Sequence, residues 1–176
     1  MEIITENENF ALIFDKFSSL LGDDLQAYSG HCYRMLNYMN YWGLEEDELH
    51  VASIALPFHD IGVWTHNTMD YLEVSFLEAR KYIRMNKIEV DEEAVESMIL
   101  GHHKIRSIRE NDLSEKTRKA DLVDLSFGML SFGIPGKQMK AIKKAFPYAG
   151  FQKSIYGKVM GYAFRHPGNP FPMMKF

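Results

Sequence analysis

The sequence contains one cysteine, Cys32, and no long apolar run. A single cysteine excludes an internal disulfide and favours a reducing compartment. No stretch approaches the roughly 18 apolar residues that a membrane-spanning helix needs. The first residues, MEIITENENF, are polar and acidic, and they lack the basic start and apolar stretch of a signal peptide. We therefore expect a cytoplasmic protein with no membrane partner.

An excess of positive charge is also missing. Lys and Arg number 20 against 24 Asp and Glu, which leaves a formal net charge of −4. Nucleic-acid binding usually requires a basic stripe, so we expect no nucleic-acid partner. Internal repeats and low-complexity segments are absent too. A chain of 176 residues can bury one core and is too short to suggest two domains.

No segment shows the sustained alternation of apolar and polar residues that is typical of a β-strand. Apolar residues instead recur at helical spacing. Asp91 and Ser114 are the expected N-caps of two helices, and Gly62 is expected just beyond the end of a third. The spacing predicts helices over residues 8–21, 23–42, 44–60, 69–86, 92–103, 115–130, 136–146 and 151–165. The predicted fold class is all-α.

The chain divides into an N-terminal helix (1–22) packed on the domain, a helical domain (23–165) and a C-terminal extended strap (166–176). The Pro and Gly residues of the strap preclude regular helix. The strap carries four side chains too apolar for a solvated tail: Phe171, Met173, Met174 and Phe176. We favour a strap docked on its own domain. The alternative is a lid, or a contact between the two copies of a homodimer.

Several polar residues lie within apolar helical segments. They are His31 in YSGHCYRML, His59 and Asp60 in LPFHDIGVW, His102 and His103 in MILGHHKI, and Asp121 and Asp124 in RKADLVDLSF. A buried carboxylate loses its hydration, which costs free energy unless a partner compensates. Taken singly, each has an ordinary explanation, such as a histidine bonded to a backbone carbonyl or an ion pair.

Taken together, two imidazoles and two carboxylates from these segments could be satisfied by one divalent cation. Two carboxylates would balance the charge of the ion, and two neutral imidazoles would complete the set. Helical bundles commonly build metal sites from side chains on facing helices. Mixed His and Asp ligands disfavour calcium and indicate manganese, iron, cobalt, nickel or zinc, with magnesium also compatible.

The order His31, then His59–Asp60, then Asp121 resembles the H…HD…D signature of the HD superfamily of metal-dependent phosphohydrolases. The resemblance extends over residues 23–130. It implies an HD-domain (phosphodiesterase-like) helical bundle in which these four residues bind the metal. The segments HDIGVWTHNTMDYLEVSFLEARKYI, GHHKIR and FPYAGF are similar to a group of uncharacterised bacterial HD-domain proteins. That group brings no assigned substrate.

The resemblance implies an enzyme that hydrolyses phosphoric ester bonds with help from the metal. Its substrate would be a small phosphomonoester or phosphodiester, a class that includes nucleotides. His102 and His103 are the predicted catalytic residues, which could hold a second metal, protonate the leaving oxygen or bind the phosphate. Lys104 and Arg106 are predicted to bind the substrate anion. A basic helix end is the structural alternative for these two residues.

Two departures from the superfamily pattern limit what the resemblance implies. Members that bind two metals carry another histidine some way after the HD pair, but residues 80–88 contain none and His66 lies nearer to the pair. Val63 and Trp64 stand where compact nucleotidases carry a glutamate. We therefore expect one tightly held metal, with a second weak or absent. An iron-dependent oxygenase and a non-catalytic domain that senses a metal or nucleotide are the alternative functions.

Overall fold

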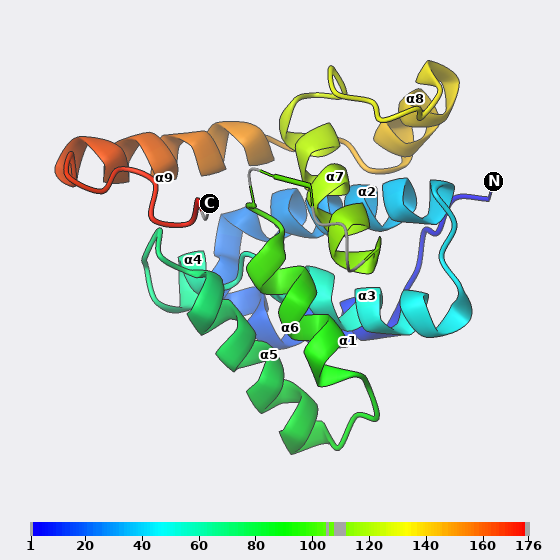
Figure 1. Ribbon diagram of the computed structural model, residues 1–176, viewed down its shortest axis with the longest axis horizontal. Coiled ribbons are helices and arrows are strands. Elements are labelled where there is room, and N and C mark those ends of the chain that lie inside the picture. The colour runs from blue at the N-terminus through cyan, green and yellow to red at the C-terminus, as the bar shows by residue number, and fades with distance from the viewer. Residues whose placement is uncertain (1, 105, 108–111, 175–176) are drawn as a thin grey trace.

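The computed structural model describes residues 2–104, 106–107 and 112–174, and across these residues the chain is helical with no β-strand (Figure 1). This confirms the predicted all-α class. The elements are α1 (Glu8–Leu21), the short 3₁₀ helix η1 (Gly22–Asp24), α2 (Leu25–Tyr41), α3 (Glu46–Phe58), α4 (Gly62–Thr65), α5 (Leu72–Asn86), α6 (Glu92–Gly101), α7 (Asp112–Leu125), α8 (Gly136–Ala145) and α9 (Phe151–Arg165).

Most helix ends lie within a few residues of their expected positions. Gly22 follows α1 with a φ of 51°, a conformation that glycine adopts without steric cost. Asp91 caps α6, because its side chain accepts the backbone N–H groups of Glu93 and Ala94. The expected cap at Ser114 is wrong, since α7 begins at Asp112 and includes Ser114. The Ser114 hydroxyl instead lies 2.5 Å from that of Ser97 on α6.

Gly62 has a different role from the one expected. It starts the short helix α4 and does not close α3. A Cβ at this position would lie 2.7 Å from the carbonyl oxygen of Tyr71 and 2.9 Å from Oγ of Ser75. The Gly62 N–H also donates to Ser75 Oγ across 2.9 Å. The missing side chain therefore allows the turn after α3 to pack directly on the start of α5.

The helices pack around α2 and α3, which cross the middle of the molecule (Figure 1). The helix α1 covers α3, while α7 packs on α2 and α6 packs on α3, α5 and α7. Phe10, Tyr28 and Phe58 are among the largest fully buried side chains in this core. The C-terminal ends of α3 and α6 consequently lie beside α2 and α7. This junction holds the polar residues described below.

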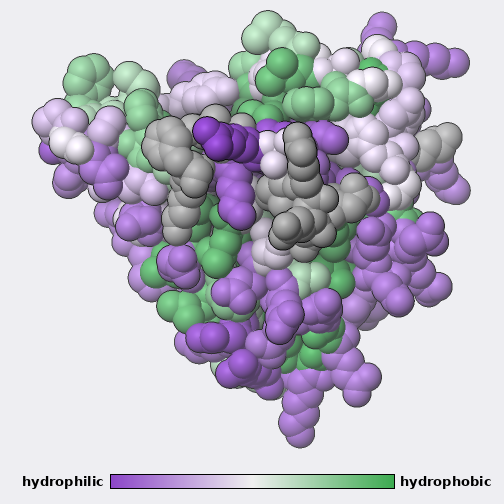
Figure 2. Space-filling view, viewed as in Figure 1, coloured by the Kyte–Doolittle hydropathy of each residue, from purple (hydrophilic) through white to green (hydrophobic). Residues whose placement is uncertain are grey.

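The helix α9 extends to one side, and the chain beyond it turns back towards the middle of the molecule (Figure 1). Polar residues cover much of the face over α5 and α6, whereas hydrophobic residues gather over the α7–α8 loop and the far end of α9 (Figure 2). Met129 in that loop and Phe164 near the end of α9 are more than four-fifths exposed, at 84 % and 81 %. Among the described helices, none combines the length and the apolar character required to cross a membrane.

Candidate metal centre

Five buried polar residues converge where α2, α3, α6 and α7 meet. They are His31 on α2, His59 and Asp60 directly after α3, His102 directly after α6, and Asp121 on α7. Each is between 0 and 4 % exposed. His31 Nε2 lies 3.2 Å from His59 Nε2 and 3.5 Å from Asp121 Oδ1, and Asp60 Oδ2 lies 3.3 Å from His59 Nε2. The structure thus brings together the four predicted ligands and adds His102.

The three imidazole rings are held with the same nitrogen pointing inward. His59 Nδ1 lies 2.6 Å from the carbonyl oxygen of Leu56, and His102 Nδ1 lies 2.7 Å from that of Ile99. A carbonyl oxygen only accepts, so both Nδ1 atoms carry a hydrogen. His31 Nδ1 donates likewise to the carboxylate of Asp124. In the neutral rings every Nε2 therefore presents a lone pair to the cluster.

Among the residues that the structure describes, two atoms of the cluster have no hydrogen-bond partner. Asp60 Oδ1 and His102 Nε2 lie 3.3 Å apart, and both are buried and unpaired. With a hydrogen on Nδ1 of His102, an acceptor faces an acceptor across this gap. An unsatisfied buried polar group costs about 1–3 kcal/mol, and more when it is charged. A cation bound between these atoms would convert both unsatisfied acceptors into ligands.

The spacing of the donor atoms suits an ion within each of two overlapping groups. Ligand atoms bonded to one ion at about 2.0–2.2 Å lie roughly 3.0–3.5 Å apart when they are neighbours. His31, His59 and Asp121 form one group that could hold a metal, and His59, Asp60 and His102 form another. Both groups depend on His59, whose Nδ1 is engaged and whose Nε2 has only one lone pair. The two groups therefore share His59, and its Nε2 can bind an ion of only one group at a time.

Without a cation, protons compensate the negative charge. Burial alone would lower the pKa of His59, but the charge of Asp60 raises it well above its usual value. Burial and the neighbouring Asp60 raise the pKa of Asp121. Burial lowers the pKa of His31 to about 4 and also lowers the pKa of His102, so both remain neutral at pH 7. The cluster thus attracts positive charge while keeping imidazole lone pairs available.

A second layer of contacts fixes His31. The carboxylate of Asp124 accepts the His31 Nδ1–H at 2.8 Å and is bound by both arms of the Arg34 guanidinium, at 2.6 and 2.7 Å. Gln152 on α9 donates to the same carboxylate at 3.2 Å. Asp124 is one of the polar residues embedded in apolar segments, but no pattern in the sequence indicates a role for Arg34 or Gln152. Each of Arg34 and Asp124 lies three residues after a ligand on its helix, a spacing that places both on one face.

Tyr28 supports the turn that carries His59 and Asp60. Its hydroxyl donates to the carbonyl oxygen of Pro57 at 3.1 Å and accepts the backbone N–H of Asp60 at 3.1 Å. Tyr28 is fully buried, and burial raises the pKa of its phenol well above the usual value. The hydroxyl therefore remains a donor at neutral pH and holds the end of α3 against α2.

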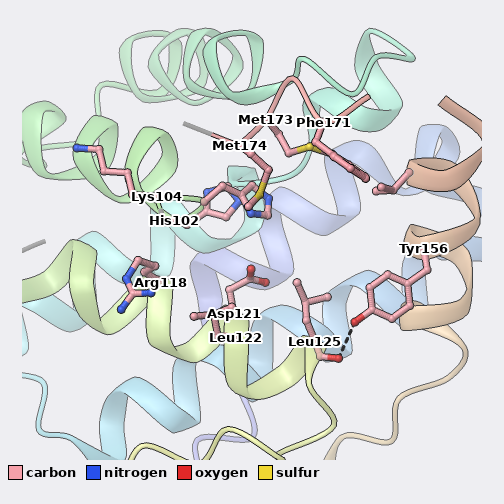
Figure 3. A pocket seen from close by; sticks show the side chains of 12 residues that line it. His102, Lys104, Arg118, Asp121, Leu122, Leu125, Tyr156, Phe171, Met173 and Met174 are labelled. Atoms are coloured by element: carbon pink, nitrogen blue, oxygen red, sulfur yellow. Dashed lines mark hydrogen bonds between the residues drawn. The ribbon is translucent and has the colours of Figure 1, made fainter. Parts of the chain in front are cut away.

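A cavity of about 390 Å³ adjoins the cluster, and His102, His103, Lys104 and Asp121 contribute to its wall (Figure 3). His103 Nε2 lies 2.6 Å from the Tyr71 hydroxyl and belongs to neither group that could hold a metal. Lys104 is exposed at the cavity wall. Arg106 is exposed and is not among the described lining residues.

The other residues discussed from the sequence lie farther from the centre. His66 is exposed, pairs with Thr65 Oγ1 at 2.8 Å, and is in neither group that could hold a metal. In the strap, Phe171, Met173 and Met174 line the cavity, whereas the predicted contact of Phe176 lies outside the described residues.

No protein-family model, no curated protein and no solved structure matched the chain. The description of this protein therefore rests on its own residues. They define an all-helical protein with a buried His/Asp cluster that could hold a metal ion beside a cavity.

Proposed function

We propose that the protein is a metal-dependent hydrolase of the HD type that cleaves a phosphomonoester or phosphodiester. The observation that carries the proposal is the unpaired couple Asp60 Oδ1 and His102 Nε2, buried in a cluster that adjoins a cavity. The H…HD…D order of His31, His59, Asp60 and Asp121 supports the phosphohydrolase class. The metal, the reaction and the substrate are all parts of this proposal.

His31, His59, Asp60 and Asp121 would hold the ion, and His102 Nε2 lies 3.3 Å from Asp60 Oδ1 beside them. Manganese, iron, cobalt, nickel, zinc or magnesium suits this donor set. When bound, such an ion supplies an activated water at neutral pH and polarises a phosphoryl oxygen. The residues of the chain hold the imidazole lone pairs inward and exclude bulk water through the burial of all five side chains.

His103 and Lys104 would position the phosphoryl group. The Tyr71 hydroxyl lies 2.6 Å from His103 Nε2, and in the tautomer in which the phenol donates to Nε2 the Nδ1–H of a neutral His103 remains a hydrogen-bond donor. Burial, followed by the neighbouring His102, lowers the pKa of His103 well below its usual value. A neutral His103 would therefore donate a hydrogen bond to a phosphoryl oxygen and would not act as a general acid. Lys104 would add a point charge at the exposed edge.

The test is elemental analysis of protein purified without added metal, followed by a panel of phosphomonoesters and phosphodiesters assayed with each candidate ion. We expect about one ion per chain and hydrolysis that disappears with a chelator and returns with the ion. Protein that binds no divalent ion under any condition would refute the proposal. Iron binding with oxygen consumption and no hydrolysis would favour the oxygenase instead, and a bound ion without turnover would favour a sensor.

A further inference from the structure

We propose that the cavity beside the metal centre accepts a hydrocarbon group, so that the substrate is a phosphoester of an apolar alcohol. This inference rests on the proposed hydrolase function and specifies its substrate class. It is carried by the chemistry of the cavity wall, which changes from charged to apolar across a short distance (Figure 3).

The apolar part of the wall comes from three separate segments: α7, α9 and the chain that returns after α9. Its residues are Leu122, Leu125, Val159, Phe171, Met173 and Met174. Phe171 and Met174 are 46 % and 40 % exposed, whereas Met173 is 4 % exposed. When a ligand covers the apolar surface of an open cavity, that surface is removed from water and binding becomes more favourable. The flexible methionine side chains can adjust to the shape of the ligand.

Two polar side chains of the cavity wall are already engaged: Arg118, on the side of Lys104, and Tyr156, on the opposite side (Figure 3). The guanidinium of Arg118 binds both carboxylate oxygens of Glu115, at 2.8 and 2.7 Å. The hydroxyl of Tyr156 donates to the carbonyl oxygen of Leu125 at 2.7 Å. A sugar or a nucleobase buried there would lose its hydration without gaining these partners, which is costly. A hydrocarbon has no such requirement.

The polar groups that remain are on the side of the cluster. His102 and Asp121 lie in the middle of the view in Figure 3, with Lys104 on one side and Leu125, Tyr156 and Phe171 on the other. A ligand with an anionic head and an apolar body matches this order. Its phosphoryl group would reach His102, His103 and Lys104, and its body would lie against α7 and α9. The volume of about 390 Å³ lies in the range of pockets that bind small molecules.

Non-hydrolysable alkylphosphonates test the inference without turnover. Titration calorimetry with methyl-, butyl-, hexyl- and octylphosphonate, and with phenylphosphonate, should show affinity that rises with apolar size. Each buried methylene should strengthen binding about three- to fourfold until the cavity is full. A phenylphosphonate that binds more tightly than hexylphosphonate would identify the body as aromatic, and the reverse order as aliphatic. Equal affinities for methyl-, octyl- and phenylphosphonate would overturn the inference.

Variants locate the binding to this wall. Leu122→Asn keeps the branched shape of the side chain but makes its end polar, and it should weaken the binding of octylphosphonate at least tenfold while changing that of methylphosphonate little. Leu130→Asn is the matched control, because Leu130 is 48 % exposed and lies outside the cavity wall. Val159→Thr is a milder second variant in case Leu122→Asn fails to fold. Equal loss in Leu122→Asn and its control would contradict the inference.

Activity separates this inference from the proposed function. Hydrolysis of glycerol phosphate or a nucleoside monophosphate as efficient as that of octyl phosphate and phenyl phosphate would confirm a hydrolase and refute the apolar substrate. Binding that rises with the apolar size of the phosphonate, without hydrolysis of any ester, would support the apolar cavity and refute the hydrolase.

Discussion

His31 Nδ1 donates to Asp124 across 2.8 Å, and this contact determines which nitrogen of the His31 ring faces the cluster. Asp124 can serve this purpose because Arg34 holds both of its carboxylate oxygens. Burial alone would raise the pKa of Asp124, but the hydrogen bonds from Arg34 and His31 lower it below its usual value. The carboxylate is therefore charged at neutral pH and orients His31 for binding.

Asp124→Asn should destabilise the protein and weaken metal binding. The substitution leaves the fully buried Arg34 without its counter-ion, which typically costs about 3–5 kcal/mol. Loss of a carboxylate behind a ligating histidine typically lowers metal affinity 10- to 100-fold. Urea unfolding and a competitive chelator titration measure the two effects. Glu92→Gln is the control, because the exposed Arg84–Glu92 pair should contribute less than about 1 kcal/mol.

Asp60→Ala should abolish metal binding, because Asp60 is the carboxylate that faces both His59 and His102. The melting temperature of the metal-loaded protein should fall, since bound metal stabilises only the folded state. The metal-free protein should lose less stability than the metal-loaded protein, because His59 can return to its neutral form once the neighbouring carboxylate is removed. Asp15→Ala, at an exposed position on α1, provides the control. Equal metal content in the Asp60 variant and the parent would show that Asp60 is not a ligand.

His102→Ala and His103→Ala should have different effects on turnover. Removing His102 takes away a side chain beside Asp60 and should lower kcat by two or more orders of magnitude while the ion is retained with reduced affinity. Removing His103, which contacts Tyr71 at the cavity wall, should mainly raise KM. Steady-state kinetics and metal analysis of both variants distinguish the roles. A KM effect for His102→Ala and a kcat effect for His103→Ala would reverse the roles of the two histidines.

Gly62→Ala should destabilise the protein by about 1–3 kcal/mol, because the new Cβ would lie 2.7 Å from the backbone carbonyl oxygen of Tyr71. Gly157→Ala on α9 is the matched control, since no atom lies within 4 Å of the Cβ it would add. Alanine within a helix is better than glycine by about 0.5–1 kcal/mol, so this variant should be slightly more stable than the parent. Thermal unfolding compares the two. Similar behaviour of both variants would contradict close packing at Gly62.

Asp24 should connect α9 to the domain in a pH-dependent way. Its carboxylate accepts Trp64 Nε1–H and the Ser154 hydroxyl, each at 2.9 Å, and pairs with Lys158 at 3.2 Å. Burial alone would raise the pKa of Asp24, but these partners lower it below 3.8. The stabilisation is therefore present above about pH 3.8 and is lost as the pH falls through the lower folded-state pKa.

Asp24→Asn should accordingly cost about 1 kcal/mol at pH 7 and progressively less below pH 3.8. Urea unfolding at several pH values measures the difference, and amide exchange should increase in α9. Asp23→Asn is the control, because Asp23 is the exposed neighbour of Asp24. A stability difference that does not decrease on acidification would show that the charge of Asp24 contributes nothing.

The amino-acid sequence by itself determined the helices and the four candidate ligands. Helical periodicity is a local property, because the side chains of residues three and four positions apart share a face. Polar side chains within apolar segments need partners, which predicted a shared cation, and the H…HD…D resemblance then selected His31, His59, Asp60 and Asp121. Predictions from local sequence were less accurate where the same residue type is common in two different structural roles. Gly62 suits both a helix end and a close contact, and Ser114 both a cap and a first turn.

Only the tertiary structure decided which distant residues complete the site. Arg34 and Asp124 are separated by 90 positions in the chain, and nothing in either segment alone predicts that they form a buried pair. The apolar cavity exists because α7, α9 and residues 171–174 contribute to the same wall. Such features arise from packing between helices, whose side-chain contacts are absent until the chain has folded.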